Sequence, residues 1–253
     1  MNIFRHIRHH FTFLILGALC SLNLTTKSWA DNTGLWVGTV ILDRVSEITP
    51  STDSVSQTPT PVADPLAIRI IIYVNSNGSA SMLRWATLMN YQTTPGDDSS
   101  IEEIIVIDED DFYVSGVVGY TTDGNRPIGR RFSTAHYDWP DGGELSMSGT
   151  VADGLNGTIE LSATHSTNPF YHRYHNMHQD GRAVTRYIEI TNLADASDSA
   201  VSAYNVLEGD YYEVINGLAN TNTDTTTRDS SIIMQGTLTI VQVSSASQLG
   251  IPQ

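Results

Sequence analysis

Cysteine and lysine are almost absent from this 253-residue chain, which has one of each, Cys20 and Lys27. Both lie within the first thirty residues, so residues 31–253 can form no disulfide and contain no cysteine nucleophile. Long apolar runs are also missing beyond residue 30, which excludes a later membrane-spanning helix. The remaining 223 residues are nevertheless enough to bury a core of their own, so a fold without disulfides is expected.

The first thirty residues have the pattern of an export signal. Arg5 and Arg8 precede a short apolar run, Phe11–Leu22, and small residues at Ser28 and Ala30 match a cleavage site. The apolar run is too short for a transmembrane helix. The sequence therefore predicts a cleaved signal peptide, residues 1–30, no membrane insertion after cleavage, and a secreted or otherwise extracytoplasmic protein in the periplasm or at the cell surface.

Positive charge is scarce as well. The chain has 13 basic and 28 acidic residues. Removing the signal segment takes away three basic residues and no acidic one, which leaves 10 arginines against 28 carboxylates and a formal charge of −18. Such a field repels nucleic acid and anionic membranes, so neither is expected as a partner.

What is abundant is β-type alternation between Gly, Asn and Asp turns. About ten short strands are predicted, and no segment has a sustained helical period. This pattern predicts one all-β domain, residues 31–253, built as an antiparallel sandwich or jelly roll. Asn77-Gly78 favours a tight type I′ hairpin turn, and Asn156-Gly157 is also expected in a turn. Residues 49–65, rich in Ser, Thr and Pro, are expected to form an extended, mobile loop.

Histidines gather in one segment, "HSTNPFYHRYHNMHQDGR", residues 165–182. His172, His175 and His178 recur at every third residue, and three neutral imidazoles are a ligand set for a divalent metal such as zinc. Asp180 or Glu160 would add a carboxylate. The alternative is structural: imidazoles both donate and accept hydrogen bonds, and would fasten a long loop to the sheet. Catalysis by these histidines is a third reading.

Other candidate sites are weaker. Asp108–Asp111 form an acidic cluster without the rest of a calcium-loop pattern, so a solvated turn is expected. Ser133, His136 and Asp138 lie close in sequence but do not form a triad along one strand, because alternate residues point to opposite faces.

Three tryptophans are candidates for stacking against sugar rings. Trp36 and Trp85 lie in apolar runs and are expected in the core, which leaves Trp139 as the exposed candidate.

Several segments occur in an order that resembles an uncharacterised family of exported bacterial β-rich domains. They are "GLWVGTVILDRVSE", "LAIRIIIYV", "RPIGRRFSTAHYDW", "TNPFYHRYHNMHQD" and "LEGDYYEVINGL", followed by "GTLTIVQVS". The most recognisable family element is a loop of the form N-P-F-x-H-x-Y-H-P-D-H-D. Asn168, Pro169, Phe170, His172, Tyr174, His175 and His178 match it. Asn176, Met177 and Gln179 depart from it, and two acidic positions are lost. The resemblance implies an exported β-structure and no established activity.

The leading functional hypothesis is a non-enzymatic domain with a binding or structural role at the cell envelope or outside the cell. Three alternatives stay open. The first is an oligomer or filament subunit that exchanges its first strand, Leu35–Ser46, with a neighbour. The second is a metal-binding protein or metal-dependent enzyme using the histidine segment. The third is a carbohydrate-binding module. Partners would accordingly be further copies of the chain, or an extracellular polymer or carbohydrate.

Overall fold

The computed structural model describes residues 32–47, 49–50, 58–118, 129–134, 144–165, 168, 183–196, 205–218 and 230–251. These residues form thirteen strands and two short 3-10 helices, and no α-helix occurs among them. Nothing in these ranges is a helix of the length and apolarity needed to cross a membrane. All pairings between strands are antiparallel, so the predicted all-β antiparallel class is confirmed.

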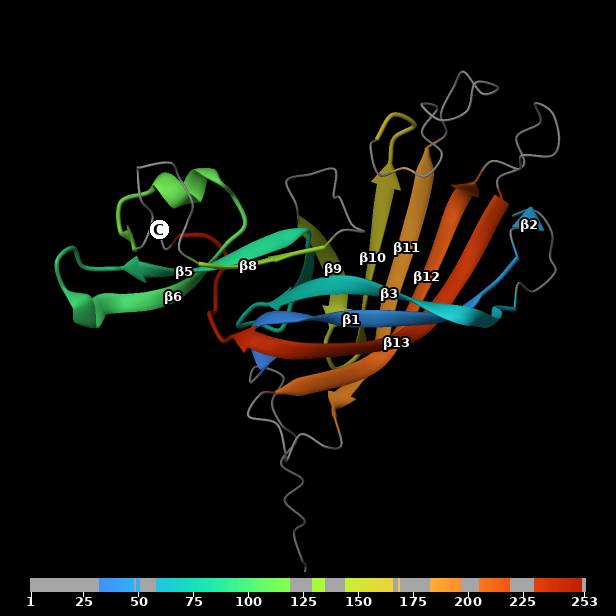
Figure 1. The fold of residues 1–253 in the computed structure, drawn as a ribbon, viewed down its shortest axis with the longest axis horizontal. Coiled ribbons are helices and arrows are strands. Elements are labelled where there is room, and N and C mark those ends of the chain that lie inside the picture. The colour runs from blue at the N-terminus through green and yellow to red at the C-terminus, as the bar shows by residue number, and fades with distance from the viewer. Residues whose placement is uncertain are drawn as a thin grey trace, which may run out of the picture.

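The main sheet is a closed barrel of eight strands (Figure 1). In bonded order these are β1 (Gly34–Val45), β3 (Thr60–Val74), β4 (Ala80–Leu83), β9 (Glu144–Thr150), β10 (Gly154–Leu161), β11 (Val184–Asp195), β12 (Val206–Leu218) and β13 (Ser230–Ser244). The ring closes because β1 pairs with β3 on one side and with β13 on the other. A short strand, β2 (Thr49–Pro50), pairs with the start of β13.

This closure corrects the expected sandwich or jelly roll. Alternation along a strand shows that one face is buried, but a sandwich and a barrel both satisfy it. The pairing of β1 with β13 decides for a barrel, because it joins strands that are about two hundred residues apart in the chain.

The barrel interior is filled by apolar side chains from all eight strands. Trp36, Ile70, Leu155, Ile188 and Leu238 are among those with at most a trace of exposed surface. An eight-stranded barrel is just wide enough for its own side chains to fill it. The inward residues therefore form a packed core. The expectation that Trp36 lies in the core is confirmed.

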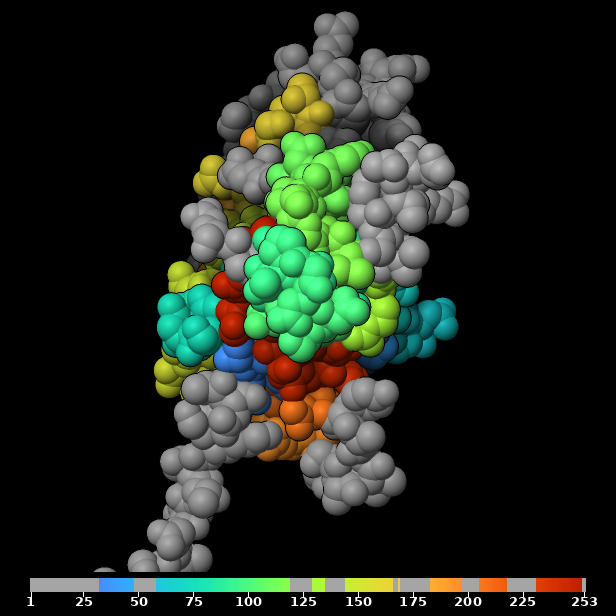
Figure 2. Space-filling view, turned by 90° about the vertical axis from the view of Figure 1, so that its left-hand side faces the viewer, coloured from blue at the N-terminus to red at the C-terminus, as the bar shows by residue number. Residues whose placement is uncertain are grey.

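A second, four-stranded sheet is inserted between β4 and β9. It consists of β5 (Trp85–Gln92), β6 (Ile101–Val106), β7 (Val117–Val118) and β8 (Arg130–Ser133), with η2 (Asp98–Ser100) and η3 (Asp110–Tyr113) between its strands. One face packs on the outer side of β1 and β3, where Leu35 and Ile71 meet Ala86, Leu88 and Ile105. Figure 2 shows this layer in green against the red C-terminal segment. It covers one side of the barrel.

Both predicted Asn-Gly turns differ in detail from expectation. The chain between β3 and β4 turns over Asn75–Ser79, where only Gly78 has a positive φ, of 86°. A type I′ turn needs two residues with positive φ. Here the turn is held by the Asn75 side chain, whose Oδ1 accepts hydrogen bonds from the backbone N–H groups of Asn77 and Ser79. Asn156-Gly157 is no turn and lies inside β10, where a Cβ on Gly157 would stand 2.8 Å from the Met147 sulfur.

The expected mobile loop over residues 49–65 is partly strand. Residues 49–50 form β2, residues 60–65 begin β3, and residues 51–57 lie outside the described chain. Arg44 pairs with Pro61 while Leu42 pairs with Leu66, so residues 62–65 bulge opposite Asp43. Prolines are tolerated there because this part of β3 has a hydrogen-bonded neighbour on one side only, β1.

Candidate functional site

The predicted metal ligands His172, His175, His178 and Asp180 lie outside the described residues, so the metal site stays a prediction. Glu160 is described: it is exposed on β10 and pairs with Thr185. The start of the histidine segment is anchored at the barrel rim. There the buried Asn168 side chain donates to the Ser162 carbonyl oxygen over 2.9 Å. This prediction is tested by comparing the metal content of the purified chain with that of a His172→Ala/His175→Ala variant.

The acidic cluster Asp108–Asp111 lies in the connection between β6 and β7, where a solvated turn was expected, and its last two residues begin η3. The Asp108 carboxylate accepts the backbone N–H of Asp110 over 2.9 Å. Burial, with smaller contributions from Asp108 and Asp110, raises the pKa of Asp111. Across the described ranges, no three His, Cys, Asp or Glu side chains are grouped so that they could hold a metal ion.

The remaining sequence candidates are described only in part. Ser133 ends β8, while His136, Asp138 and Trp139 fall outside the described chain. Trp85 is half-buried in the second sheet, with its ring centroid 6.2 Å from that of Phe112. The Arg131 guanidinium stacks on the Trp85 ring, 4.8 Å from its centroid. One face of this ring is therefore covered by another side chain of the protein.

A polar network lies inside the barrel, on β11 and β12. Arg186, whose side chain is 14% exposed, donates from Nε to Glu213 Oε1 over 2.5 Å. The Glu213 side chain is 1% exposed and accepts a second hydrogen bond, of 3.0 Å, from the Tyr211 hydroxyl. The carboxylate is thus paired and hydrogen-bonded on both oxygens, as a buried charge must be. Sequence reasoning missed this network because its residues look like ordinary polar strand residues.

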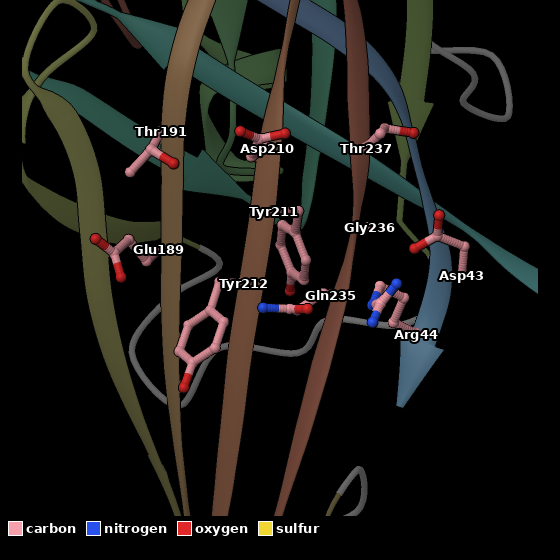
Figure 3. A pocket seen from close by; sticks show the side chains of 10 residues that line it. All are labelled: Asp43, Arg44, Glu189, Thr191, Asp210, Tyr211, Tyr212, Gln235, Gly236 and Thr237. Atoms are coloured by element: carbon pink, nitrogen blue, oxygen red, sulfur yellow. The ribbon is translucent and has the colours of Figure 1, made fainter. Parts of the chain in front are cut away.

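The outer face of the same strands carries an open pocket of about 480 Å³ (Figure 3). Its side chains come from the neighbouring strands β11, β12, β13 and β1, and include Glu189, Asp210, Tyr212, Gln235, Thr237 and Asp43. A second hollow of about 530 Å³ shares Asp210 and Thr237 and adds Asn192, Glu208 and Thr239. We call the two adjoining hollows the outer groove. Its volumes lie in the range of small-molecule sites.

Two irregularities shape the outer groove. The register of β1 against β13 shifts between Leu42 and Arg44, so Asp43 is an extra residue in that pairing, and both Asp43 and Arg44 line the groove. β11 shifts in the same way after Thr191, where Asn192 has a φ of 55°. Such bulges redirect side chains and are common beside functional sites.

The electrostatics of the outer groove are acidic and centred on Tyr212. Burial, followed by the Glu189 carboxylate and Tyr187, raises the pKa of Tyr212. Glu189 pairs directly with Tyr212 across the two strands, and Tyr187 is diagonal to it. Asp210 accepts from Asn192 Nδ2 over 2.6 Å, and Arg44 donates to the Pro59 carbonyl oxygen over 3.0 Å.

Other polar side chains of the outer groove have no such partner. Asp43, Glu189, Tyr212 and Gln235 are each partly buried, and none of them makes a side-chain hydrogen bond or ion pair with another described residue. None of the four is fully buried, so water or a ligand can reach them. These four are therefore available to a ligand in a way that Glu213 is not.

A scan of protein-family models found none that matches this chain, and a search of the curated proteins found no significant match. The resemblance to an exported β-rich family thus stays a prediction. The outer groove was not anticipated from the sequence, although two signals point to it. "GDYYEVINGL" places an acidic residue and a tyrosine on each face of a strand, and "QGTLT" places polar side chains on one face of a strand.

Proposed function

We propose that this chain is an exported, non-enzymatic binding domain that uses the outer groove as its binding surface. The observation that carries the proposal is the contrast between a barrel interior filled by its own side chains and an outer groove in which the side chains of Asp43, Glu189, Tyr212 and Gln235 make no hydrogen bond with a described residue. The predicted export signal of residues 1–30 and the strong negative charge support a domain that meets its ligand outside the cytoplasm.

A crystallographic fragment screen of the chain tests the binding surface without assuming a ligand class. Fragments are expected to gather on β11, β12 and β13 beside Tyr212, and to leave that position in a Thr191→Trp variant that fills the hollow. Fragments that gather only elsewhere would reject the groove as the binding surface.

The non-enzymatic part has its own test. Incubation of the chain with soluble oligosaccharides and peptides, followed by mass spectrometry, is expected to show no new products. Turnover that survives repurification of the chain and disappears with Glu189→Gln would make the domain an enzyme instead.

A second function, strand exchange between copies, is favoured by one observation. β1 closes the barrel between β3 and β13 along nearly its whole length, and it places Trp36, Val40 and Leu42 in the core. It is the first described strand of the chain, so a neighbouring copy could supply it through the same two ladders.

A variant without residues 31–48 separates the two functions. Strand exchange predicts that it binds a synthetic peptide of residues 31–48 and regains the Trp36 fluorescence of a buried indole. A deletion variant that stays monomeric and folded with no affinity for the peptide would reject exchange and leave the binding proposal intact.

A further inference from the structure

The lining of the outer groove combines an aromatic ring with neutral and acidic hydrogen-bonding groups. Tyr212 lines its first hollow, and Tyr187 on the neighbouring strand is diagonal to it. Thr191, Thr237 and Gln235 surround it with hydroxyl and amide groups. A tyrosine ring offers an apolar face and a polar end, which suits a ligand with one apolar face and hydroxyl groups at its rim. Sugar rings have this construction.

The groove side chains that have no described partner are well suited to bind the hydroxyl groups of a ligand. Each carboxylate, of Asp43 and of Glu189, accepts hydrogen bonds only, at two oxygens, and so matches pairs of neighbouring hydroxyl groups. Gln235 both donates and accepts. All three are partly buried without a described protein partner, so a ligand that supplies hydroxyl groups would satisfy them.

The negative charge of the outer groove limits which ligands it can bind. Asp43, Glu189 and Asp210 outnumber the single cation, Arg44, in the first hollow, and the second hollow adds Glu208. Acidic glycans such as uronates or sulfated chains would be repelled. A basic peptide would be attracted by charge, but β11, β12 and β13 are each paired on both sides, so the groove offers no strand edge for peptide backbone.

The length of the outer groove indicates more than one sugar unit. The two hollows share Asp210 and Thr237, and the second continues along β12 and β13 to Glu208 and Thr239. A chain of several sugars, lying along the strands, would fill both hollows. A single monosaccharide would leave one of them empty.

We propose that the outer groove binds a neutral polysaccharide, with a sugar ring stacked on Tyr212 and its hydroxyl groups bonded to Asp43, Glu189 and Gln235. This inference rests on the proposed binding function and names its ligand class. It goes beyond the earlier carbohydrate hypothesis, because that hypothesis relied on Trp139, which lies outside the described residues, and the groove is built from other residues.

The test is a titration of the full chain, ¹⁵N-labelled, with hexasaccharides of glucose, xylose, mannose and N-acetylglucosamine in different linkages. Polygalacturonate is the anionic probe and an arginine octapeptide the cationic one. At least one neutral hexasaccharide is expected to shift the amide signals of β11–β13 saturably. Polygalacturonate is expected to leave them unchanged.

Three variants make the titration specific. Tyr212→Ala is expected to weaken hexasaccharide binding about tenfold or more, which is the loss of one well-packed contact. Glu189→Gln keeps the shape and is expected to weaken binding a few-fold. Tyr113→Ala, a tyrosine 71% exposed on η3 and away from the groove, is the matched control and is expected to bind as the wild type does.

The outcomes separate the inference from the function on which it rests. Groove shifts with the arginine peptide and with no hexasaccharide would overturn the polysaccharide and keep the binding function. Hexasaccharide binding that Tyr212→Ala leaves unchanged would overturn the groove as its site. No groove shift with any probe would overturn the polysaccharide inference, and an empty groove in the fragment screen would then remove the binding function too.

Discussion

Two polar clusters on the same pair of strands are used in opposite ways. Arg186, Tyr211 and Glu213 point into the barrel and bond to one another. Glu189 and Tyr212 point outward, and neither makes a side-chain hydrogen bond with another described residue. The difference teaches that a buried polar group must satisfy itself within the protein, whereas a polar group at a groove keeps its hydrogen-bonding capacity for a ligand.

The largest effect is expected from breaking the inner cluster. Glu213→Leu removes the buried carboxylate to which the Arg186 guanidinium donates, so this ion pair is lost inside the barrel. Removing one partner of a buried pair costs about 3–5 kcal/mol. Urea unfolding should show this loss, and Glu189→Leu, the outward glutamate, should stay within about 0.5 kcal/mol of wild type. Equal losses of unfolding free energy for both variants would mean that the inward and outward glutamates contribute equally to stability.

A smaller effect tests whether the inner pair acts as a unit. Arg186→Met combined with Glu213→Leu removes both charges and keeps apolar volume. We expect the double variant to be more stable than Glu213→Leu alone, by about 1 kcal/mol or more, because it also removes the guanidinium that has lost the Glu213 carboxylate. The check is a double-mutant cycle from urea unfolding. Additive losses would show that the two side chains do not depend on each other.

Removing the hydroxyl of the inward Tyr211 or of the outward Tyr212 tests the comparison between the two clusters. Tyr211→Phe removes a 3.0 Å hydrogen bond to a buried carboxylate and should cost about 1.5–3 kcal/mol. Tyr212→Phe, on the next residue and the opposite face, should change the free energy of unfolding by less than about 0.5 kcal/mol. Thermal unfolding of both variants measures the difference. A neutral Tyr211→Phe would mean that its hydroxyl does not stabilise the inner cluster.

Tyr73 sharpens the comparison from a third position, the covered outer face of β3. It is 5% exposed, and its hydroxyl has no hydrogen-bond partner among the residues that the structure describes. Removing an unsatisfied buried hydroxyl relieves its desolvation penalty, so Tyr73→Phe should leave stability unchanged or raise it by about 1 kcal/mol. Urea unfolding near neutral pH checks this. A clear loss of stability would mean that the hydroxyl is bonded after all.

The same residue predicts a pH dependence. Burial, with a smaller contribution from the Glu144 carboxylate, raises the pKa of Tyr73 to about 12. The unfolded chain, with a tyrosine pKa of about 10, loses this proton first as the pH rises. Stability from Tyr73 is therefore complete below about pH 10 and is lost as the pH approaches 12. The difference between wild type and Tyr73→Phe should change with pH only in that window.

Much of the strand content could be predicted from the sequence, because alternation and turn residues act locally. Gly34–Val45 was predicted as part of the first strand, and the pattern around Asn77-Gly78 predicted its hairpin. Turn type was less certain, because Asn75 caps that turn with its own side chain. Asn156-Gly157 failed as a turn because its glycine makes room for Met147 on a neighbouring strand, a contact that no local pattern shows.

The candidate site was less predictable than the fold. Attention fell on the histidine segment because its composition is unusual. The outer groove is made of common residues from four strands, and two register shifts help to bring them together. Register shifts depend on partner strands, so the sequence of one strand does not reveal them.

Tyr211, Tyr212 and Glu213 show where the sequence stops and the tertiary structure begins. The sequence by itself determined that Tyr211 and Glu213 share one face of a strand and that Tyr212 takes the other, because side chains alternate along a strand. It did not determine which face is inside. Only closure of the barrel decided that, since the pairing of β1 with β13 and the approach of Arg186 made the interior a place where Glu213 is satisfied.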